Sequence, residues 1–393
     1  MKAYNIGVVV QRYGEEVNGG AEYLARQIAE RLALYSNVHV YTTCAVDHVT
    51  WQNEYPERLS WVNGVTVERF AVDRHRDMRG FSDRHRVALQ HPFDMSIQTQ
   101  WLVEQGPSCP SLLGAIAKDR HRHDAFIFFT YLYYPTIFGL PIVSDKALLV
   151  PFAHDEPMIR MPFFAGLFAS TSQVMYQTEE ERVLVESIFP VAHKSAGVAG
   201  CGIQVPAGIR SQFDGRGQDG ARALYVGRIE EGKGCDEMIE FVMRYNTLRD
   251  SKLTLTLVGK ANMPIPRDPH IICLGFVDEE KKWDFLVDSD LLIVPSRYES
   301  LSMVLLEAFS VSRPVLVNSR CDVLRGHCIR SNGGLYYSGF EEFLYAVDRL
   351  KGDAALRAKM GENGRRYVES NYTWDRVIES YGEAVERLAV YQG

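Results

Sequence analysis

The chain has 393 residues, of which 46% are hydrophobic and 24% are charged, and its formal net charge is −7. This length predicts two or three domains with a large buried core, and the composition is that of an ordinary soluble globular protein. The 50 acidic side chains outnumber the 43 basic ones. That balance argues against a dedicated nucleic-acid-binding protein, which would carry a basic excess.

Seven cysteines are present, and none forms a CxxC pair. We interpret them as buried or free thiols in a reducing compartment. A strand is predicted almost directly after Met1, so we expect no targeting segment. No apolar run approaches the roughly 18–20 residues that are needed to span a bilayer. The expected location is the cytoplasm, with peripheral contact at the inner face of the membrane left open.

Short β-branched and aromatic runs alternate with amphipathic stretches in both halves of the chain. Such alternation predicts parallel sheets that are covered by helices on both faces. In the first half the predicted strands are Asn5–Val10, Val38–Thr42, Thr66–Phe70, Ala125–Phe129, Ala147–Val150 and Gly166–Ser170. In the second half they are Arg222–Val226, Leu253–Val258, Ile271–Leu274, Leu291–Val294 and Pro314–Asn318. Helical spacing of apolar residues is found at Ala21–Leu34 and Trp374–Tyr391.

The best candidate for a linker is Ala199–Gly220, which is rich in Gly, Pro, Asp and Gln and lacks apolar periodicity. It divides the chain into halves of comparable size. We therefore predict an α/β protein with two Rossmann-like, doubly wound parallel-sheet domains that face each other across a cleft. Ligands of such sheets bind at the carboxyl ends of the strands.

One loop in the second half combines glycines with two cations. The loop 227–234 joins the strand predicted at Arg222–Val226 to a helix, and three glycines, the first of them Gly227, loosen it. Arg228 and Lys233 thus lie at the carboxyl end of a strand, where a guanidinium and an ammonium suit phosphate oxygens. The alternative is a solvated loop with two surface cations.

A second loop follows the apolar strand Leu291–Val294 and precedes a helix that reaches about Ser310. We expect Ser300 or Ser302 to cap this helix and to leave its first N–H groups free for an anion.

Two carboxylates, Glu299 and Glu307, belong to the same segment. Eight helical residues rise about 12 Å, so the two would hold different parts of one long ligand. A glycosidase pair would instead flank a single bond, with its carboxyl groups roughly 5–10 Å apart. Glu307 is either an exposed helix residue or, because its neighbours are apolar, a buried one that needs a partner.

The pattern Gly-Arg…Lys-Gly followed by Glu-(seven residues)-Glu resembles the large family 4 of retaining glycosyltransferases, which belong to the glycosyl transferases of group 1 and have the two-domain GT-B fold. The resemblance covers nearly the whole chain. Its further motifs are Asn18–Glu22 with Leu24-Ala25, His154-Asp155, Gly275–Val277, Ser312–Val315 and Tyr372–Asp375. The chain departs from the family twice: Ser300-Leu301-Ser302-Met303 replaces the commoner Pro-Phe-Gly-Leu, and Ser312 replaces the glycine of Gly-x-Pro-Val.

The resemblance implies roles for the two C-terminal loops. Arg228 and Lys233, after Gly227, would bind the donor diphosphate and stabilise the leaving charge, and Glu307 would hold the nucleotide ribose. Glu299 would hold the donor sugar and phosphate. The backbone N–H groups of Ser300, Leu301 and Ser302 would assist it.

The resemblance also implies roles outside these loops. Phe276 and Val277 would flank the base. Gly19 and Gly20 would let the backbone approach the phosphates or the acceptor. His154 would lie beside the transferred sugar, although a lone histidine is as often a satisfied structural residue.

At the level of domains, residues 1–200 would bind the acceptor and residues 201–375 the nucleotide sugar, and the helix 376–393 would pack back on the first domain. Two basic stretches, Arg74–Arg86 and Lys118–His123, are either solvated faces or sites for an anionic acceptor or membrane surface. The aromatic stretch Phe128–Phe138 is either buried packing or the wall of an acceptor pocket.

The implied reaction is transfer of a hexose, with retained anomeric configuration, from a UDP- or GDP-sugar to a glycan or lipid-linked acceptor. The implied process is surface polysaccharide or lipopolysaccharide synthesis. We expect no metal cofactor, because the histidines at 121, 123 and 327 do not combine with Cys or Asp at ligand spacing. The alternatives are a nucleotide-sugar epimerase or phosphorylase on the same fold, or a catalytically silent nucleotide-sugar-binding protein. A dinucleotide oxidoreductase is disfavoured, because no G-x-G-x-x-G follows the first strand.

Overall fold

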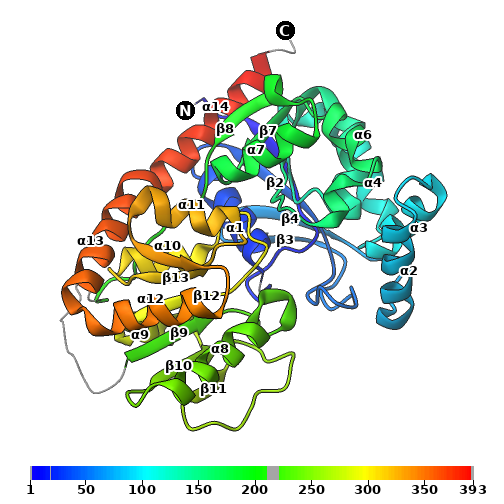
Figure 1. Ribbon diagram of the computed structural model, residues 1–393. Helices are drawn as coiled ribbons and strands as arrows, with labels where there is room; N and C mark the ends of the chain where they lie inside the picture. The colour runs from blue at the N-terminus through cyan, green and yellow to red at the C-terminus, as the bar shows by residue number, and fades with distance from the viewer. Residues whose placement is uncertain (1, 18, 210–220, 391–393) are drawn as a thin grey trace. The chain divides into compact units, whose positions relative to one another are not determined.

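The structure is a computed structural model that describes residues 2–17, 19–209 and 221–390. Asn18, Tyr391 and the second half of the predicted linker, residues 210–220, lie outside the described residues. The chain divides into two compact units (Figure 1). Met1–Gly200 and Asp375–Gly393 form the N-terminal unit, and Cys201–Trp374 forms the C-terminal unit.

The N-terminal unit is built on an eight-stranded sheet with the order β3-β4-β2-β1-β5-β6-β7-β8. The β3–β4 pair is antiparallel, and the other neighbouring strands are parallel. The strands are β1 Asn5–Val9, β2 Asn37–Thr43, β3 Leu59–Val62, β4 Val65–Phe70, β5 Ala125–Phe129, β6 Ala147–Val150, β7 Gln173–Tyr176 and β8 Ser195–Val198. The helices are α1 Gly20–Leu32, α2 Met78–Gln90, α3 Met95–Gln105, α4 Pro110–Asp119, α5 Tyr134–Gly139, α6 Phe163–Ser170, α7 Glu179–Ile188 and α14 Trp374–Val390.

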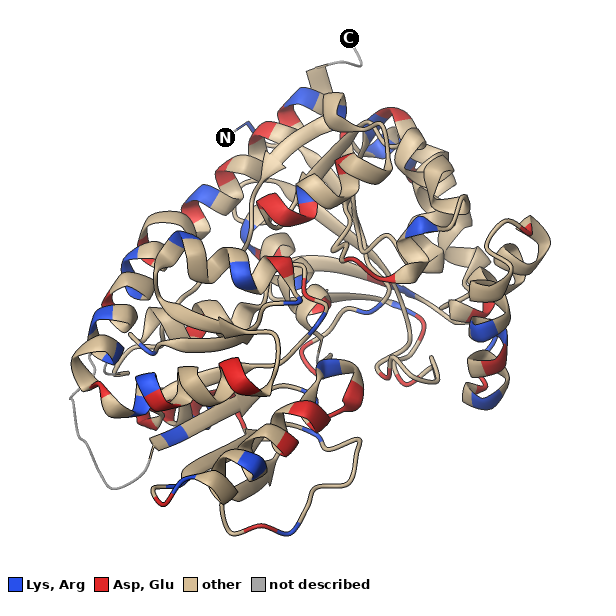
Figure 2. Ribbon diagram, viewed as in Figure 1, with Lys and Arg blue, Asp and Glu red and all other residues tan. Residues whose placement is uncertain are grey.

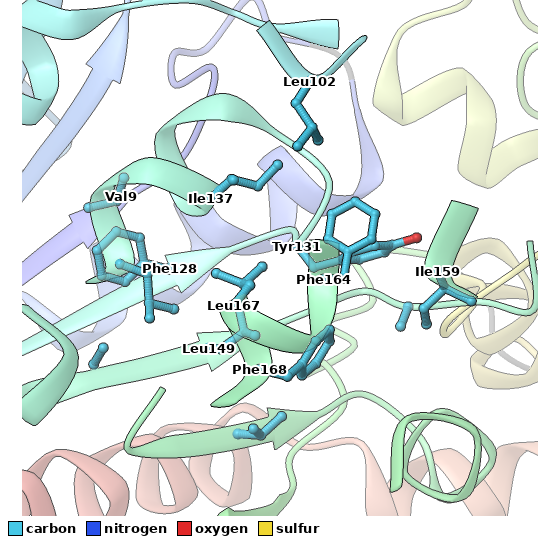
Figure 3. Close-up of a cluster of buried hydrophobic side chains, with 14 of the residues drawn as sticks. Val9, Leu102, Phe128, Tyr131, Ile137, Leu149, Ile159, Phe164, Leu167 and Phe168 are labelled. Carbon is cyan, nitrogen blue, oxygen red and sulfur yellow. The ribbon is translucent and has the colours of Figure 1, made fainter. Parts of the chain in front are cut away.

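The core of this unit contains much of the aromatic stretch Phe128–Phe138. Phe128 and Tyr131 are buried, and the Tyr131 ring lies 4.8 Å, between centroids, from that of Phe164 on α6. Figure 3 shows these side chains meeting Leu149 of β6 in one apolar cluster. For Phe128 and Tyr131, packing in the core of their own unit is therefore the explanation, and not the wall of an acceptor pocket.

The C-terminal unit has a six-stranded parallel sheet with the order β11-β10-β9-β12-β13-β14. The strands are β9 Ala221–Val226, β10 Leu253–Val258, β11 Ile271–Gly275, β12 Leu291–Val294, β13 Val315–Asn318 and β14 Gly334–Tyr337. The helices are α8 Cys235–Leu248, α9 Glu279–Asp288, α10 Met303–Ser310, α11 Asp322–Ser331, α12 Phe340–Gly352 and α13 Ala354–Asn371. All four residues of β12 and of β13 are buried, as strands covered on both faces must be.

The predicted fold class, α/β with two parallel-sheet units, is confirmed. The strand predicted at Gly166–Ser170 is wrong, because this segment is the second half of helix α6. Its apolar residues Leu167 and Phe168 reach the core from a helix. An apolar run this short has no periodicity that could distinguish a strand from a helix.

The last helix, α14, is amphipathic and belongs to the N-terminal unit from Asp375 onward. Val377, Tyr381, Val385 and Leu388 are buried at helical spacing. Figure 2 shows acidic and basic residues distributed along the helix between them. Among the described residues, no helix is both long enough and apolar enough to cross a membrane.

Candidate functional site

The strand order of the C-terminal unit reverses between β9 and β12. The chain runs from β9 outward through β10 to β11 and then returns to β12 on the other side of β9. Loops that leave the carboxyl ends of two such strands turn in opposite directions and leave a crevice for ligands. The loop after β9 carries Arg228 and Lys233, and the loop after β12 carries Glu299. The topology alone therefore places these residues beside one another.

Glycines bring these loops into close contact. Gly234 has a φ of 74°, and a Cβ at this position would lie 2.5 Å from the carbonyl oxygen of Pro295 in the other loop. Gly227 has a φ of 149°, and its N–H donates to the carbonyl oxygen of Val258 at 2.9 Å. A Cβ on Gly259 would lie 1.9 Å from the Gly227 carbonyl oxygen. Larger residues would force the loops apart.

The structure joins two of the predicted site residues in an ion pair. Lys233 ends a short 3₁₀ turn, Glu231–Lys233, and its Nζ lies 2.8 Å from Glu299 Oε1. Both side chains are partly exposed. The pair therefore holds a cation and an anion together at the strand switch point, where solvent and ligands can still reach them.

The other two charged candidates have different partners. Arg228 Nη1 lies 3.2 Å from Glu230 Oε1 in its own loop, and the Arg228 side chain is 47% exposed. Glu307 Oε1 accepts a hydrogen bond from Lys282 Nζ of α9 at 2.9 Å. Burial raises the pKa of Glu307, and the Lys282 ammonium opposes that shift. Glu307 is thus a mostly buried carboxylate, 15% exposed, that has a partner, and its interpretation as an exposed residue is wrong.

Lys282 is a residue that the sequence did not indicate. It lies in the charged run Glu279–Lys282 at the start of α9, where nothing distinguishes it from an ordinary solvated helix face. Its side chain is only 12% exposed, however, and it also contacts Glu279. An unpaired Glu307 in an apolar helix was the available signal that a cation had to lie near it.

The expected side-chain cap on α10 is absent. Ser302 occupies the N-cap position with φ 67° and ψ 77°, a left-handed conformation, and its side chain forms no cap hydrogen bond. Its hydroxyl is buried and forms no hydrogen bond to the part of the chain that the structure describes. The Ser302 hydroxyl therefore does not satisfy the first amides of α10, and the start of this helix is suited to an anion.

A buried histidine supports this loop from behind. His327 Nε2 lies 2.9 Å from the carbonyl oxygen of Leu301, and its Nδ1 lies 3.1 Å from the hydroxyl of Tyr367. A carbonyl only accepts, so Nε2 carries the proton and Nδ1 accepts from Tyr367. Burial lowers the pKa of His327 to about 3, so the ring is neutral. Tyr367 is also 3.0 Å from the hydroxyl of Tyr372.

Phe276 and Val277 follow β11 at the edge of the sheet. Gly275 has a φ of 71°, which turns the chain, and the Phe276 ring is 70% exposed. An exposed aromatic ring at the carboxyl end of a strand is available for stacking on a planar group.

The remaining candidates lie in the N-terminal unit. Gly19 precedes α1 beside a buried ion pair in which Arg12 Nη2 lies 2.6 Å from Glu22 Oε1. A Cβ on Gly19 would lie 2.2 Å from Glu22 Oε2, so this glycine makes room for the pair. Gly20 is the first residue of α1, which begins without a side-chain cap.

His154 follows β6 in a loop that also carries Glu156. His154 Nδ1 lies 3.6 Å from Glu156 Oε1, and that oxygen accepts a hydrogen bond from the Tyr131 hydroxyl at 2.8 Å. The preceding N–H, of Ala153, donates to the buried carboxyl of Glu181 at 2.5 Å. The loop is therefore held on both sides of His154 by side chains from its own unit.

Comparison with known proteins finds a family match in the C-terminal half of the chain. Residues 211–367 match the family model of glycosyl transferases group 1. A D-inositol 3-phosphate glycosyltransferase of Salinispora arenicola is 30% identical over 189 residues, which is 41% of this chain and 41% of that protein. The chain spans about two-fifths of the length of the curated relatives it matches.

Two solved structures share the fold over the full chain. Sucrose-phosphate synthase of Thermosynechococcus elongatus has a TM-score of 0.75 at 16% identity, over 99% of this chain and 100% of that one. Anabaena HepE, in complex with UDP and glucose, has a TM-score of 0.66 at 14% identity, over 98% of this chain and 100% of that one. These neighbours have the GT-B fold that the sequence motifs predicted.

Proposed function

We propose that this protein transfers a sugar from a nucleoside diphosphate sugar to an acceptor with retention of configuration, because residues 211–367 match the family model of glycosyl transferases group 1. The observation that carries the proposal is the Lys233–Glu299 ion pair, 2.8 Å long, at the strand switch point of the matched unit. A cation for the diphosphate and a carboxylate for the sugar are adjacent there before any ligand binds.

In the proposed mechanism, Lys233 and Arg228 bind the diphosphate and stabilise the negative charge that develops as the glycosidic bond breaks. The uncapped amides at the start of α10 add dipoles of the same sign. Glu299 then binds hydroxyls of the transferred sugar, and Glu307 binds the ribose. The leaving phosphate accepts the acceptor's proton on the same face, so catalysis consists of positioning and charge stabilisation.

The proposed donor is a UDP- or GDP-sugar, with Phe276 and Val277 beside the base. Because the Anabaena neighbour was solved in complex with UDP, we favour a UDP-sugar over a GDP-sugar as the donor. The proposed acceptor is a glycan or a lipid-linked glycan of surface polysaccharide synthesis, bound by the N-terminal unit near Gly19, Gly20 and His154. The reaction would take place in the cytoplasm or at the inner membrane face, without a divalent metal.

The experiment that tests the proposal combines binding with product analysis. Thermal unfolding is measured with UDP, GDP, ADP and their glucose or mannose derivatives, and a true ligand at one hundred times its Kd adds about 2.7 kcal/mol of stability. The preferred donor is then incubated with an acceptor panel, in chelator, and the product anomer is determined by NMR. Transfer with the donor's anomeric configuration supports the proposal.

Three results would contradict it. An inverted product excludes the retaining mechanism, and transfer that stops in chelator and returns with Mg²⁺ or Mn²⁺ excludes metal independence. Donor isomerisation without acceptor would instead favour an epimerase, and donor cleavage by inorganic phosphate a phosphorylase. Tight donor binding with no turnover of any kind would favour a silent binding protein.

A further inference from the structure

A compact cluster of metal-ligating side chains lies in the N-terminal unit, apart from the loops described above. His39 projects from β2, Glu68 from the neighbouring β4, and Asp119 is the last residue of α4. One ligand atom from each residue lies within 4.8 Å of those of the other two. His39 is in the amino-terminal half of its strand and pairs in register with Gly7, whereas the loops with Arg12 and His154 follow carboxyl ends.

The spacing suits a small divalent cation. Tetrahedral zinc with bonds of 2.0–2.2 Å holds its ligand atoms about 3.4 Å apart. His39 Nε2 and Glu68 Oε2 are already 3.2 Å apart. The remaining separations are at most 4.8 Å, so shifts of about 1 Å in the side chains would bring all three ligand atoms to that spacing.

Buried polar atoms in the cluster lack hydrogen bonds. His39 Nε2 and Asp119 Oδ1 are inaccessible to solvent, and each has only an ion-pair contact of poor hydrogen-bond geometry among the described residues, with Glu68 and Arg122 respectively. Asp119 is only 6% exposed, and its nearest cation, Arg122, is a largely exposed side chain 3.1 Å from Oδ1. A metal ion would satisfy both atoms at once.

A second layer of side chains orients the carboxylate. Tyr41 donates its hydroxyl hydrogen to Asp119 Oδ2 at 3.0 Å, and the same hydroxyl lies 2.8 Å from His123 Nε2. The Tyr41 ring also stacks on that of His39, with centroids 4.4 Å apart. Metal sites commonly use such outer partners to fix the direction of their ligands.

We propose that His39, Glu68 and Asp119 bind one divalent transition metal ion, with water in the fourth position. One imidazole and two carboxylates match zinc, and the same ligands bind Co²⁺ for spectroscopy. The ion would tie β2 and β4 to the end of α4. The site is independent of the proposed sugar transfer, which uses no metal.

The test uses the full chain, stripped with chelator and dialysed. Zn²⁺ is titrated by calorimetry, and Co²⁺ is followed by its visible d–d absorption. We expect one Zn²⁺ per chain, an affinity lower by tenfold or more in His39→Ala and Asp119→Asn, and about tenfold lower in Tyr41→Phe. Exposed His121→Ala is the matched control and should bind like the wild type.

Arg122→Ala separates a metal site from a simple ion-pair cluster. Removing the cation beside Asp119 should tighten Zn²⁺ binding, because metal and guanidinium compete for the same oxygen. Circular dichroism checks that each variant folds. If Asp119→Asn unfolds, Glu68→Gln replaces it, because the Glu68 side chain is 32% exposed. The proposal fails if the folded wild type takes up no Zn²⁺, or if uptake survives His39→Ala and Glu68→Gln but is lost in Cys273→Ser, the exposed thiol.

Discussion

Two serines in the C-terminal unit hold backbone conformations that favour glycine. Ser302 has a φ of 67° and Ser312 a φ of 59°. Both stand where the sequence departs from the glycine of related motifs. At both positions a serine replaces the glycine, yet the backbone keeps the left-handed turn. Each serine therefore carries roughly 1–2 kcal/mol of backbone strain.

Ser312→Gly should therefore stabilise the protein. The relief of left-handed strain outweighs the extra entropy of glycine in the unfolded chain by about 0.5–1 kcal/mol. Thermal unfolding should show a rise of about 2–4 °C for each kcal/mol. Ser310→Gly, in the helical conformation at the end of α10, is the control and should lower the transition instead.

Lys233 is the residue on which proposed catalysis depends most. Lys233→Ala should lower kcat by about 10²–10³, the cost of removing one donor to a developing anion. The release of nucleotide from the preferred donor measures it. Lys359→Ala, an exposed lysine of α13, should leave the rate unchanged. Equal rates for Lys233→Ala and the wild type would remove Lys233 from the mechanism.

His327 should make stability depend on pH. Its pKa is about 6.5 in the unfolded chain and about 3 in the folded one, so its contribution is complete above pH 6.5 and is lost as the pH falls toward 3. At pH 5 the loss is about 2 kcal/mol. The free energy of unfolding, measured in urea, should therefore fall more steeply below pH 6.5 in the wild type than in His327→Gln. Parallel curves for the two proteins would show that the ring is protonated in the folded state.

At the scale of elements, the sequence predicted most interior strands well and most edge strands poorly. β5, β6, β10 and β12 have the predicted bounds because each is a fully apolar or β-branched run between breakers. The edge strands β3, β8 and β14 were not predicted, since they have mixed, partly exposed residues. The interior strand β7 was also missed, because a strand was predicted at Gly166–Ser170 instead. The site loops were located because glycines and charges at strand ends are local signals. The pairing of Glu307 with Lys282 of α9 depends on tertiary packing, which no local pattern encodes.

Gly259, the first residue after β10, has no room for a side chain. A Cβ on Gly259 would lie 1.9 Å from the Gly227 carbonyl oxygen, and the φ of Gly259 is 139°. Gly259→Ala should therefore cost on the order of 3 kcal/mol and displace the loop that carries Arg228. Denaturant unfolding and donor affinity measure the two effects. Gly352→Ala, at the end of α12 with open space around it, should be neutral or slightly stabilising.

At the scale of the whole molecule, α14 completes a unit that begins nearly 375 residues earlier in the chain. Its buried face contributes Tyr381 and Leu388, and Gln173 Nε2 of β7 donates to the carbonyl oxygen of Ala384. Removing residues 375–393 should expose that face and destabilise the N-terminal unit by several kcal/mol, at about 25 cal/mol per Å² of apolar area.

Limited proteolysis locates this loss. In the shortened chain, cleavage should appear within residues 2–200, while peptides from 221–371 stay protected. A variant with Glu379, Glu383 and Glu386 on the exposed face of α14 changed to Gln keeps the apolar contacts and should resist as the wild type does. Cleavage confined to 221–371 would contradict the assignment of α14.

The return of α14 also sets the order in which the chain can mature. A ribosome releases residues 1–200 long before the helix that closes their core, so the N-terminal unit must wait, incomplete, while the C-terminal unit is made and folds. During that interval an apolar stripe of the eight-stranded unit stays open to chaperones or to aggregation. A permuted gene that starts with α14 and continues into β1 would let this unit close first.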